Sequence, residues 1–204
     1  MSDRLASRSA LAAVAIPGRY GRKDGAPGVA LSERVDVGIA TVMARKEQAS
    51  ALRDAVRTAY GIDLPDASRH VAGSTVGFIG AGPGQWLAVS ERLPNGALAV
   101  DLSARLKGLA SISDQSDGRA VLRISGPRVR DVLAKGLPID LHPSVFAPGS
   151  AATSVIALMG VTLWQVDDAP TYDIAVFRSL AGSFWKWLTD SAAEFGCAVG
   201  PAAD

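Results

Sequence analysis

The sequence holds a single cysteine in 204 residues, which excludes an internal disulfide and any zinc or iron–sulfur site built from several cysteines. We expect this residue, Cys197, to be a small buried apolar side chain. Histidine is almost as scarce, because His70 and His142 are the only two and neither has a second histidine or cysteine close by in the sequence. The sequence therefore predicts that this chain binds no metal.

Long apolar runs and an excess of one charge sign are also missing. The 21 basic and 20 acidic residues leave a formal net charge of +1 with no basic run, so nothing predicts a nucleic-acid or anionic-membrane partner. No apolar stretch approaches the ~20 residues that span a bilayer. The short apolar run 11–16, which follows Arg4 and Arg8, is too brief for the core of a secretion signal. We therefore expect a cytoplasmic protein.

The signatures of common enzyme classes are absent as well. Residues 80–84 read GAGPG, but a strand-like segment follows them where a dinucleotide-binding loop needs a helix, and Pro83 removes a backbone donor. The sequence has no P-loop and no Gly-x-Ser-x-Gly nucleophile elbow. We therefore predict no catalytic residue and no bound cofactor for this chain.

What is present is the composition of a globular protein, with 48% apolar and 20% charged residues. The most ordered pattern covers residues 112–136, where a strand is expected to turn directly into a helix. Gly126 permits the turn, Pro127 suits the first helical position and Gly136 ends the helix. In the strand, residues of two kinds alternate: Ala120, Leu122 and Ile124 on one side, and Arg119, Val121, Arg123 and Ser125 on the other.

The rest of the chain reads as two βαββαβ-like halves with only a turn between them. We expect one compact α+β domain made of two ferredoxin-like units with mostly antiparallel sheets and helices packed on them. Its predicted parts are an irregular N-terminal arm over 1–33, a first half over 34–117 and a second half over 118–204. The expected strands are 34–43, 73–79, 85–89, 109–113, 119–125, 154–159, 161–166 and 172–177, and the expected helices are 46–60, about 97–106, 127–135 and 180–195.

Charged residues beside the central strand are the main candidates for a binding site. Asp114, Asp117, Arg119 and Arg123 could bind a carboxylate such as a folate tail through forked hydrogen bonds. They could equally form a solvent-facing sheet surface, or pair with acidic groups on another chain.

Aromatic residues favour a protein partner, because tryptophan and arginine are enriched at interface cores. Four tryptophans stand against only five phenylalanines. Trp185 and Trp187 lie at the margins of a wide apolar arc on the last helix. Together with Arg119 and Arg123, they are the predicted subunit-interface residues, although core packing is the commoner use of tryptophan.

Two blocks of the sequence resemble the gamma subunit of heterotetrameric sarcosine oxidase. The first block is 112–127, with Asp114-Gln115-Ser116 before the arginine-bearing strand, and the second is 172–196, which reads YDIAVFRSLAGSFWKWLTDSAAEFG. The resemblance implies a fold like the folate-binding domain of glycine-cleavage aminomethyltransferases. It also implies a non-catalytic structural subunit that assembles chiefly against the large alpha-type subunit.

The complex implied by this resemblance oxidises sarcosine to glycine with oxygen and produces hydrogen peroxide and 5,10-methylenetetrahydrofolate. Its FAD, FMN, NAD, tetrahydrofolate and zinc would be held by the other subunits. An alternative is a stand-alone tetrahydrofolate-binding protein related to the aminomethyltransferases, and a third is an unassigned ferredoxin-like binding domain.

Overall fold

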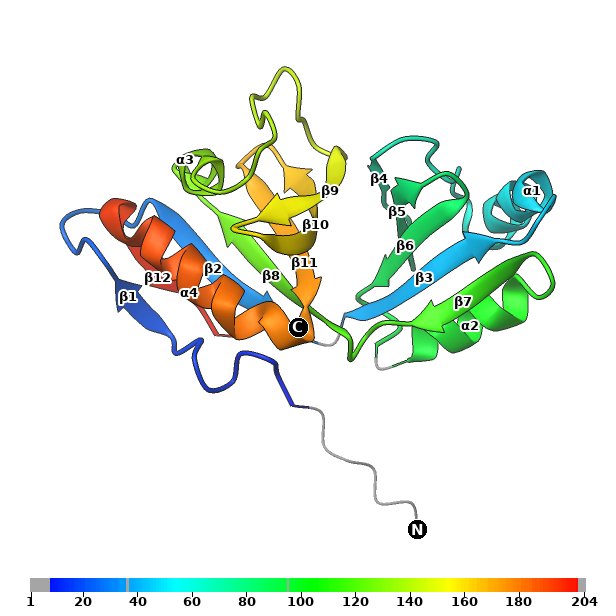
Figure 1. The fold of residues 1–204 in the computed structure, drawn as a ribbon, viewed down its shortest axis with the longest axis horizontal. Coiled ribbons are helices and arrows are strands. Elements are labelled where there is room, and N and C mark those ends of the chain that lie inside the picture. The colour runs from blue at the N-terminus through cyan, green and yellow to red at the C-terminus, as the bar shows by residue number, and fades with distance from the viewer. Residues whose placement is uncertain (1–7, 36, 95, 202–204) are drawn as a thin grey trace, which may run out of the picture.

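The computed structural model describes residues 8–35, 37–94 and 96–201, which form two β-sheets with helices on their outer faces (Figure 1). One sheet has seven strands in the order β1-β12-β2-β8-β11-β10-β9, and the other has five in the order β4-β5-β6-β3-β7. Within the described residues, every neighbouring pair of strands is antiparallel except β12 with β2. This α+β architecture confirms the predicted fold class.

The five-stranded sheet contains the four strands and two helices expected of the first βαββαβ unit, together with the short edge strand β4, which was not predicted. Its two helices cover the same face, because their apolar side chains share one core with the inward residues of the sheet. The first helix ends at Gly61, which adopts the left-handed conformation of a helix C-terminus. The elements are β3 (Gly38–Ala44), α1 (Ala49–Tyr60), β4 (His70–Val71), β5 (Gly77–Gly82), β6 (Gln85–Ser90), α2 (Ala97–Arg105) and β7 (Ala110–Asp114).

The seven-stranded sheet carries two further helices on its outer face. Val132 and Leu133 from one helix and Phe184 and Leu188 from the other are fully buried in its core. Short 3-10 turns flank the longer helix at Arg178–Leu180 and Ala193–Phe195. The elements are β1 (Gly18–Tyr20), β2 (Val29–Arg34), β8 (Arg119–Ser125), α3 (Val129–Ala134), β9 (Ala151–Ile156), β10 (Met159–Asp167), β11 (Thr171–Phe177), α4 (Ala181–Ala192) and β12 (Cys197–Val199).

The irregular arm predicted over 1–33 is wrong for its later part. Residues 1–7 lie outside the described residues, but Val29–Arg34 forms β2, which is inserted between β12 and β8. Val29 and Leu31 are buried in the core of this sheet, and so is Leu11. The six-residue strand escaped notice because a glycine- and arginine-rich run precedes it and because both partner strands are distant in the sequence.

The strand predicted over 34–43 is also divided. β2 ends at Arg34 and β3 starts at Gly38, so the chain crosses from one sheet to the other between them. Glycine is needed at position 38, because an added Cβ would lie 2.0 Å from the carbonyl oxygen of Leu93. The chain crosses back between β7 and β8, which lie in different sheets on either side of the predicted boundary at 117.

A third, smaller core joins the inner faces of the two sheets. Ile39 and Leu87 from the five-stranded sheet pack with Val121, Trp164 and other residues of the seven-stranded sheet. Backbone hydrogen bonds join the sheets near this core: His70 N donates to the Gly149 oxygen at 2.8 Å, and Ala151 N donates to the Ser68 oxygen at 3.1 Å. The two halves are thus one packed body. None of the described helices combines the length and the apolar character of a bilayer span.

Candidate functional site: a charged pocket between the sheets

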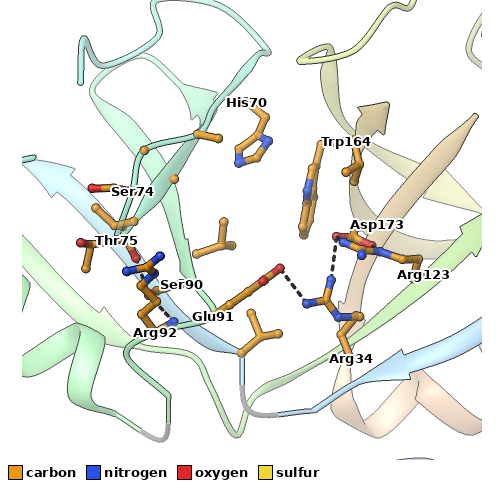
Figure 2. Close-up of a pocket in the computed structure, with 17 residues that line it drawn as sticks. Arg34, His70, Ser74, Thr75, Ser90, Glu91, Arg92, Arg123, Trp164 and Asp173 are labelled. Atoms are coloured by element: carbon orange, nitrogen blue, oxygen red, sulfur yellow. Dashed lines mark hydrogen bonds and ion pairs between the residues drawn. The ribbon is translucent and has the colours of Figure 1, made fainter. Parts of the chain in front are cut away.

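The inner faces of the two sheets enclose a pocket of about 450 Å³ (Figure 2). Trp164, Arg123 and Asp173 line it from the seven-stranded sheet, and His70 faces them from the five-stranded sheet. The pocket exists because the sheets diverge beyond their shared apolar core, so polar side chains on the inner faces have room between them.

Arg123 and Asp173 form the best-defined pair in the pocket. They are directly opposite one another on the antiparallel strands β8 and β11, where cross-strand side chains meet. Arg123 Nε and Nη2 donate to the two carboxylate oxygens of Asp173, each at 2.7 Å. This hydrogen bonding raises the pKa of Arg123 above its ordinary value, against the effect of burial. The forked geometry favours the charged form of the Arg123 guanidinium.

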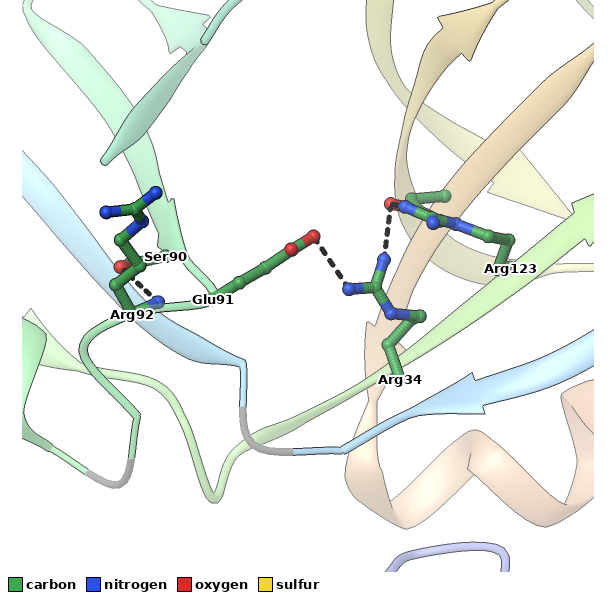
Figure 3. Close-up of polar contacts among 6 residues, drawn as sticks. Arg34, Ser90, Glu91, Arg92 and Arg123 are labelled. Carbon is green, nitrogen blue, oxygen red and sulfur yellow. Dashed lines mark hydrogen bonds and ion pairs between the residues drawn. The ribbon is translucent and has the colours of Figure 1, made fainter. Parts of the chain in front are cut away.

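Arg34 links the two sheets through charge (Figure 3). It ends β2 in the seven-stranded sheet, and its Nη2 donates at 2.6 Å to the Oε1 atom of Glu91, which follows β6 in the other sheet. Its Nη1 atom lies 3.6 Å from Asp173 Oδ2, so Asp173 interacts with two guanidinium groups. The side chains of Arg34 and Asp173 are 4% and 5% exposed, whereas that of Glu91 is 63% exposed.

His70 and Trp164 face one another across the pocket with ring centroids 5.8 Å apart. Burial lowers the pKa of His70, and the charge of Asp173 only partly opposes that effect. The Ser90 hydroxyl holds two pocket-lining segments together. Its Oγ atom donates to the Thr75 carbonyl oxygen at 2.6 Å and accepts a hydrogen bond from the Arg92 backbone N–H at 3.1 Å.

The ion pairs among the pocket residues determine which charged groups are available to a ligand. Arg34 and Arg123 are matched by two carboxylates within the cluster, so these two guanidinium groups already bind other residues, whereas Arg92 also lines the pocket. Among the described residues, no group of three or more histidine, cysteine or acidic side chains is arranged to hold a metal. Of these pairs, only Arg34 with Glu91 joins the two sheets.

The four residues predicted as carboxylate contacts do not all come together. Arg123 lines the pocket between the sheets, while Arg119 lines a separate small pocket beside the chain crossings. Asp114 lies at the end of β7, where its Oδ1 atom accepts hydrogen bonds from the backbone N–H of Ser116 at 3.0 Å and from its hydroxyl at 2.7 Å. Asp117 lines the same small pocket as Arg119.

The predicted interface tryptophans differ from one another. Trp185 is only 6% exposed within the core under α4, so the interface prediction for Trp185 is corrected: it packs the fold. The wide apolar arc of the helix is turned so far into the sheet that one margin is covered. Trp187 is half-buried, with its ring against Gly136, and its interface role stays a prediction.

Sequence reasoning missed Arg34, Glu91 and Asp173 as members of a cluster. A signal existed for Asp173, which is the one charged residue in the otherwise apolar strand segment YDIAVF. A lone carboxylate in such a strand indicates a buried pair. Glu91 offered no such signal, because it follows a strand in an ordinary turn sequence.

Comparisons with known proteins agree on one family. Residues 45–194 match the family described as "Sarcosine oxidase, gamma subunit family". A sarcosine oxidase subunit gamma from Corynebacterium sp. (strain P-1) is 37% identical over 145 residues, covering 69% of this chain and 70% of that one. Another from Arthrobacter sp. is 35% identical over 151 residues, covering 72% of each.

Solved structures give the same result for the whole fold. A chain of the heterotetrameric sarcosine oxidase from Corynebacterium sp. U-96, in complex with pyrrole 2-carboxylate, superposes with a TM-score of 0.77 at 29% identity, over 93% of this chain and 96% of that chain. The glycine cleavage system aminomethyltransferase T from Bartonella henselae shares the fold, with a TM-score of 0.64 at 14% identity, over 82% of this chain and 49% of that one.

Proposed function

The chain belongs to the sarcosine oxidase gamma subunit family, and on this premise we propose that it is the gamma subunit of a heterotetrameric sarcosine oxidase. One observation carries the proposal. The match to a chain of the heterotetrameric Corynebacterium enzyme covers 93% of this chain and 96% of that one, so it is not confined to a shared fragment. Its expected role is that of the corresponding subunit within a four-chain assembly.

Within this proposal, the chain is structural and the chemistry belongs to its partners. The complex would oxidise sarcosine to glycine, producing hydrogen peroxide and 5,10-methylenetetrahydrofolate, with flavins, NAD, folate and zinc held by the other subunits. The pairing of Arg34 and Arg123 with Glu91 and Asp173 supports a structural role, because these charges bind one another within the chain and one pair, Arg34 with Glu91, connects the two sheets. Docking chiefly on the large alpha-type subunit and a cytoplasmic location both stay predictions.

Reconstitution tests this function. The purified chain alone is expected to show no flavin absorbance and no peroxide production from sarcosine. Produced together with the other sarcosine oxidase subunits of its own source, it should co-purify with them in equal amounts. Sarcosine turnover by the isolated chain, or failure to co-purify with subunits that assemble without it, would contradict the proposal.

A second candidate is tetrahydrofolate binding by the chain itself, favoured by the position of Arg123 in the pocket between the sheets. Trp164 lines this pocket, so ligand entry should change tryptophan fluorescence. We expect no change with tetrahydrofolate up to millimolar concentrations, because Asp173 already occupies the Arg123 guanidinium. Saturable quenching that is lost in Trp164→Phe would favour the second candidate.

A further inference from the structure

An exposed apolar row crosses one end of the seven-stranded sheet. Val155 of β9 lies opposite Gly160 of β10 in the strand register. The register of β10 with β11 continues this row to Phe177, and Phe177 lies opposite Arg119 of β8. Phe177 is 46% exposed and Val155 is 44% exposed. Glycine at the middle position leaves no side chain between these two exposed ones.

This row lies just beyond the area that the five-stranded sheet covers. Two residues further along the same strands, Val121 and Ala175 occupy the same face and are buried in the core between the sheets. The side chains of the row therefore point to the side on which the two sheets meet, but nothing in the described residues covers them. Burying such area is favourable, and exposed apolar surface of this kind is typical of a protein-contact site.

The hairpin turn beside the row adds a third exposed apolar residue and backbone strain. Ala157 and Leu158 both have positive φ angles, +47° and +69°, in the two-residue turn that joins β9 to β10. Asparagine and glycine are the usual residues in such a turn, and other residues cost roughly 1–2 kcal/mol each in this conformation. Leu158 is 97% exposed, so packing within the chain does not explain why leucine stands there.

Arg119 gives the surface its charge. Its guanidinium carbon lies 4.7 Å from the centroid of the Phe177 ring. Its Nε atom is buried and has no hydrogen-bond partner among the described residues. Burial lowers the pKa of this arginine, and no carboxylate counteracts that effect. A partly buried guanidinium whose Nε atom has no partner is costly, and a carboxylate supplied by another chain would offset that cost.

We propose that the Phe177 surface, formed by Val155, Leu158, Gly160, Phe177 and Arg119, is where another sarcosine oxidase subunit docks. That subunit would place apolar side chains over Val155, Leu158 and Phe177 and a carboxylate beside Arg119. A second copy of this chain fits less well, because a two-fold contact of the surface with itself would bring in a second Arg119 and no carboxylate from the surface. The proposal rests on the proposed function and adds to it the docking face and the chemistry of the partner.

Assembly of the four-chain complex tests the proposal with substitutions on and off the surface. Phe177→Glu and Leu158→Glu should each weaken co-purification with the other subunits by at least about tenfold, the effect typical of contacts at an interface centre. Val100→Glu is the matched control, because Val100 is 72% exposed on α2 in the other half and lies outside the Phe177 surface. It should assemble within about twofold of the unsubstituted protein.

Folding and function must be separated in this test. Leu158 is nearly fully exposed, so Leu158→Glu should leave the thermal midpoint of the isolated chain unchanged or higher. A photo-crosslinking residue at position 158 should form crosslinks to another subunit in the purified complex, while one at position 100 should not.

The outcomes distinguish the two proposals. If the unsubstituted chain assembles and both Phe177→Glu and Leu158→Glu assemble equally well, the docking proposal is wrong while the proposed function stands. If the unsubstituted chain never joins the complex, the proposed function itself fails. If position 158 crosslinks only to a second copy of this chain, the docking proposal is wrong and the surface is a contact between copies.

Discussion

Removing the charge of Asp173 is expected to destabilise the fold more than its few contacts suggest. The carboxylate is 5% exposed, forms a forked pair with Arg123 and lies 3.6 Å from the nearly buried Arg34. Asp173→Asn keeps the shape but leaves two guanidinium groups facing a neutral amide. Removing one partner of a buried ion pair typically costs roughly 3–5 kcal/mol, because the remaining charge is left uncompensated.

The matched control is Glu91→Gln. Glu91 also pairs with Arg34, but its side chain is 63% exposed, and exposed ion pairs contribute only about 0–1 kcal/mol. Denaturant unfolding followed by circular dichroism should therefore separate the two variants by at least ~2 kcal/mol. In a thermal scan, Asp173→Asn should lower the midpoint by roughly 6–20 °C, at about 2–4 °C per kcal/mol for a chain of this size.

Two results would refute this reasoning. One is a loss of less than about 1 kcal/mol for Asp173→Asn, which would mean that water or rearrangement compensates the arginines. The other is an equal loss of stability in Asp173→Asn and Glu91→Gln, which would mean that the Arg34–Glu91 contact between the sheets contributes as much as the buried carboxylate. Replacing the whole cluster with Arg34→Met, Arg123→Met and Asp173→Leu should be nearly neutral, since apolar residues of similar size need no partners.

Three further predictions follow from local geometry. Burial lowers the pKa of His70 below its ordinary 6.5, so the neutral side chain should contribute its full stability above that pH, and the free energy of unfolding should decrease as the pH falls toward the folded-state pKa. Urea unfolding of His70→Gln at several pH values should show a weaker dependence on pH, and an unchanged dependence would contradict this. Gly38→Ala should destabilise the fold by roughly 1–3 kcal/mol, because the added Cβ collides with the backbone. Gly182→Ala in α4 should instead stabilise it by about 0.5–1 kcal/mol, because nothing lies near the added Cβ and alanine favours the helix. Equal melting temperatures for the two variants would contradict this packing. Replacing Ala157-Leu158 with Asn-Gly should raise stability by on the order of 1–2 kcal/mol in denaturant while weakening subunit assembly, and a stabilised variant that assembles normally would argue against the docking role of Leu158.

Local patterns predicted the five-stranded half and the strand–helix unit around Gly126 because their defining signals lie within a few residues. The alternation from Arg119 to Ser125 and the glycine stop at Gly61 are short-range features. β2 could not be predicted in the same way, since its pairing with β8 and β12 joins distant parts of the chain. The charged site was hidden for the same reason, as Arg34 and Glu91 meet only once the two sheets are packed.

The three residues on the polar side of β8 lie in three different environments. The alternation of Arg119, Val121 and Arg123 predicts a half-buried strand with its second face toward water. The packed second sheet divides that face instead: Val121 enters the core between the sheets, and Arg123 lies in the pocket beside Asp173. Arg119, at the end that the other sheet does not reach, is left with Phe177 on open surface. The fold itself provides partners for Val121 and Arg123, so within the proposed docking it is Arg119 that would meet another subunit.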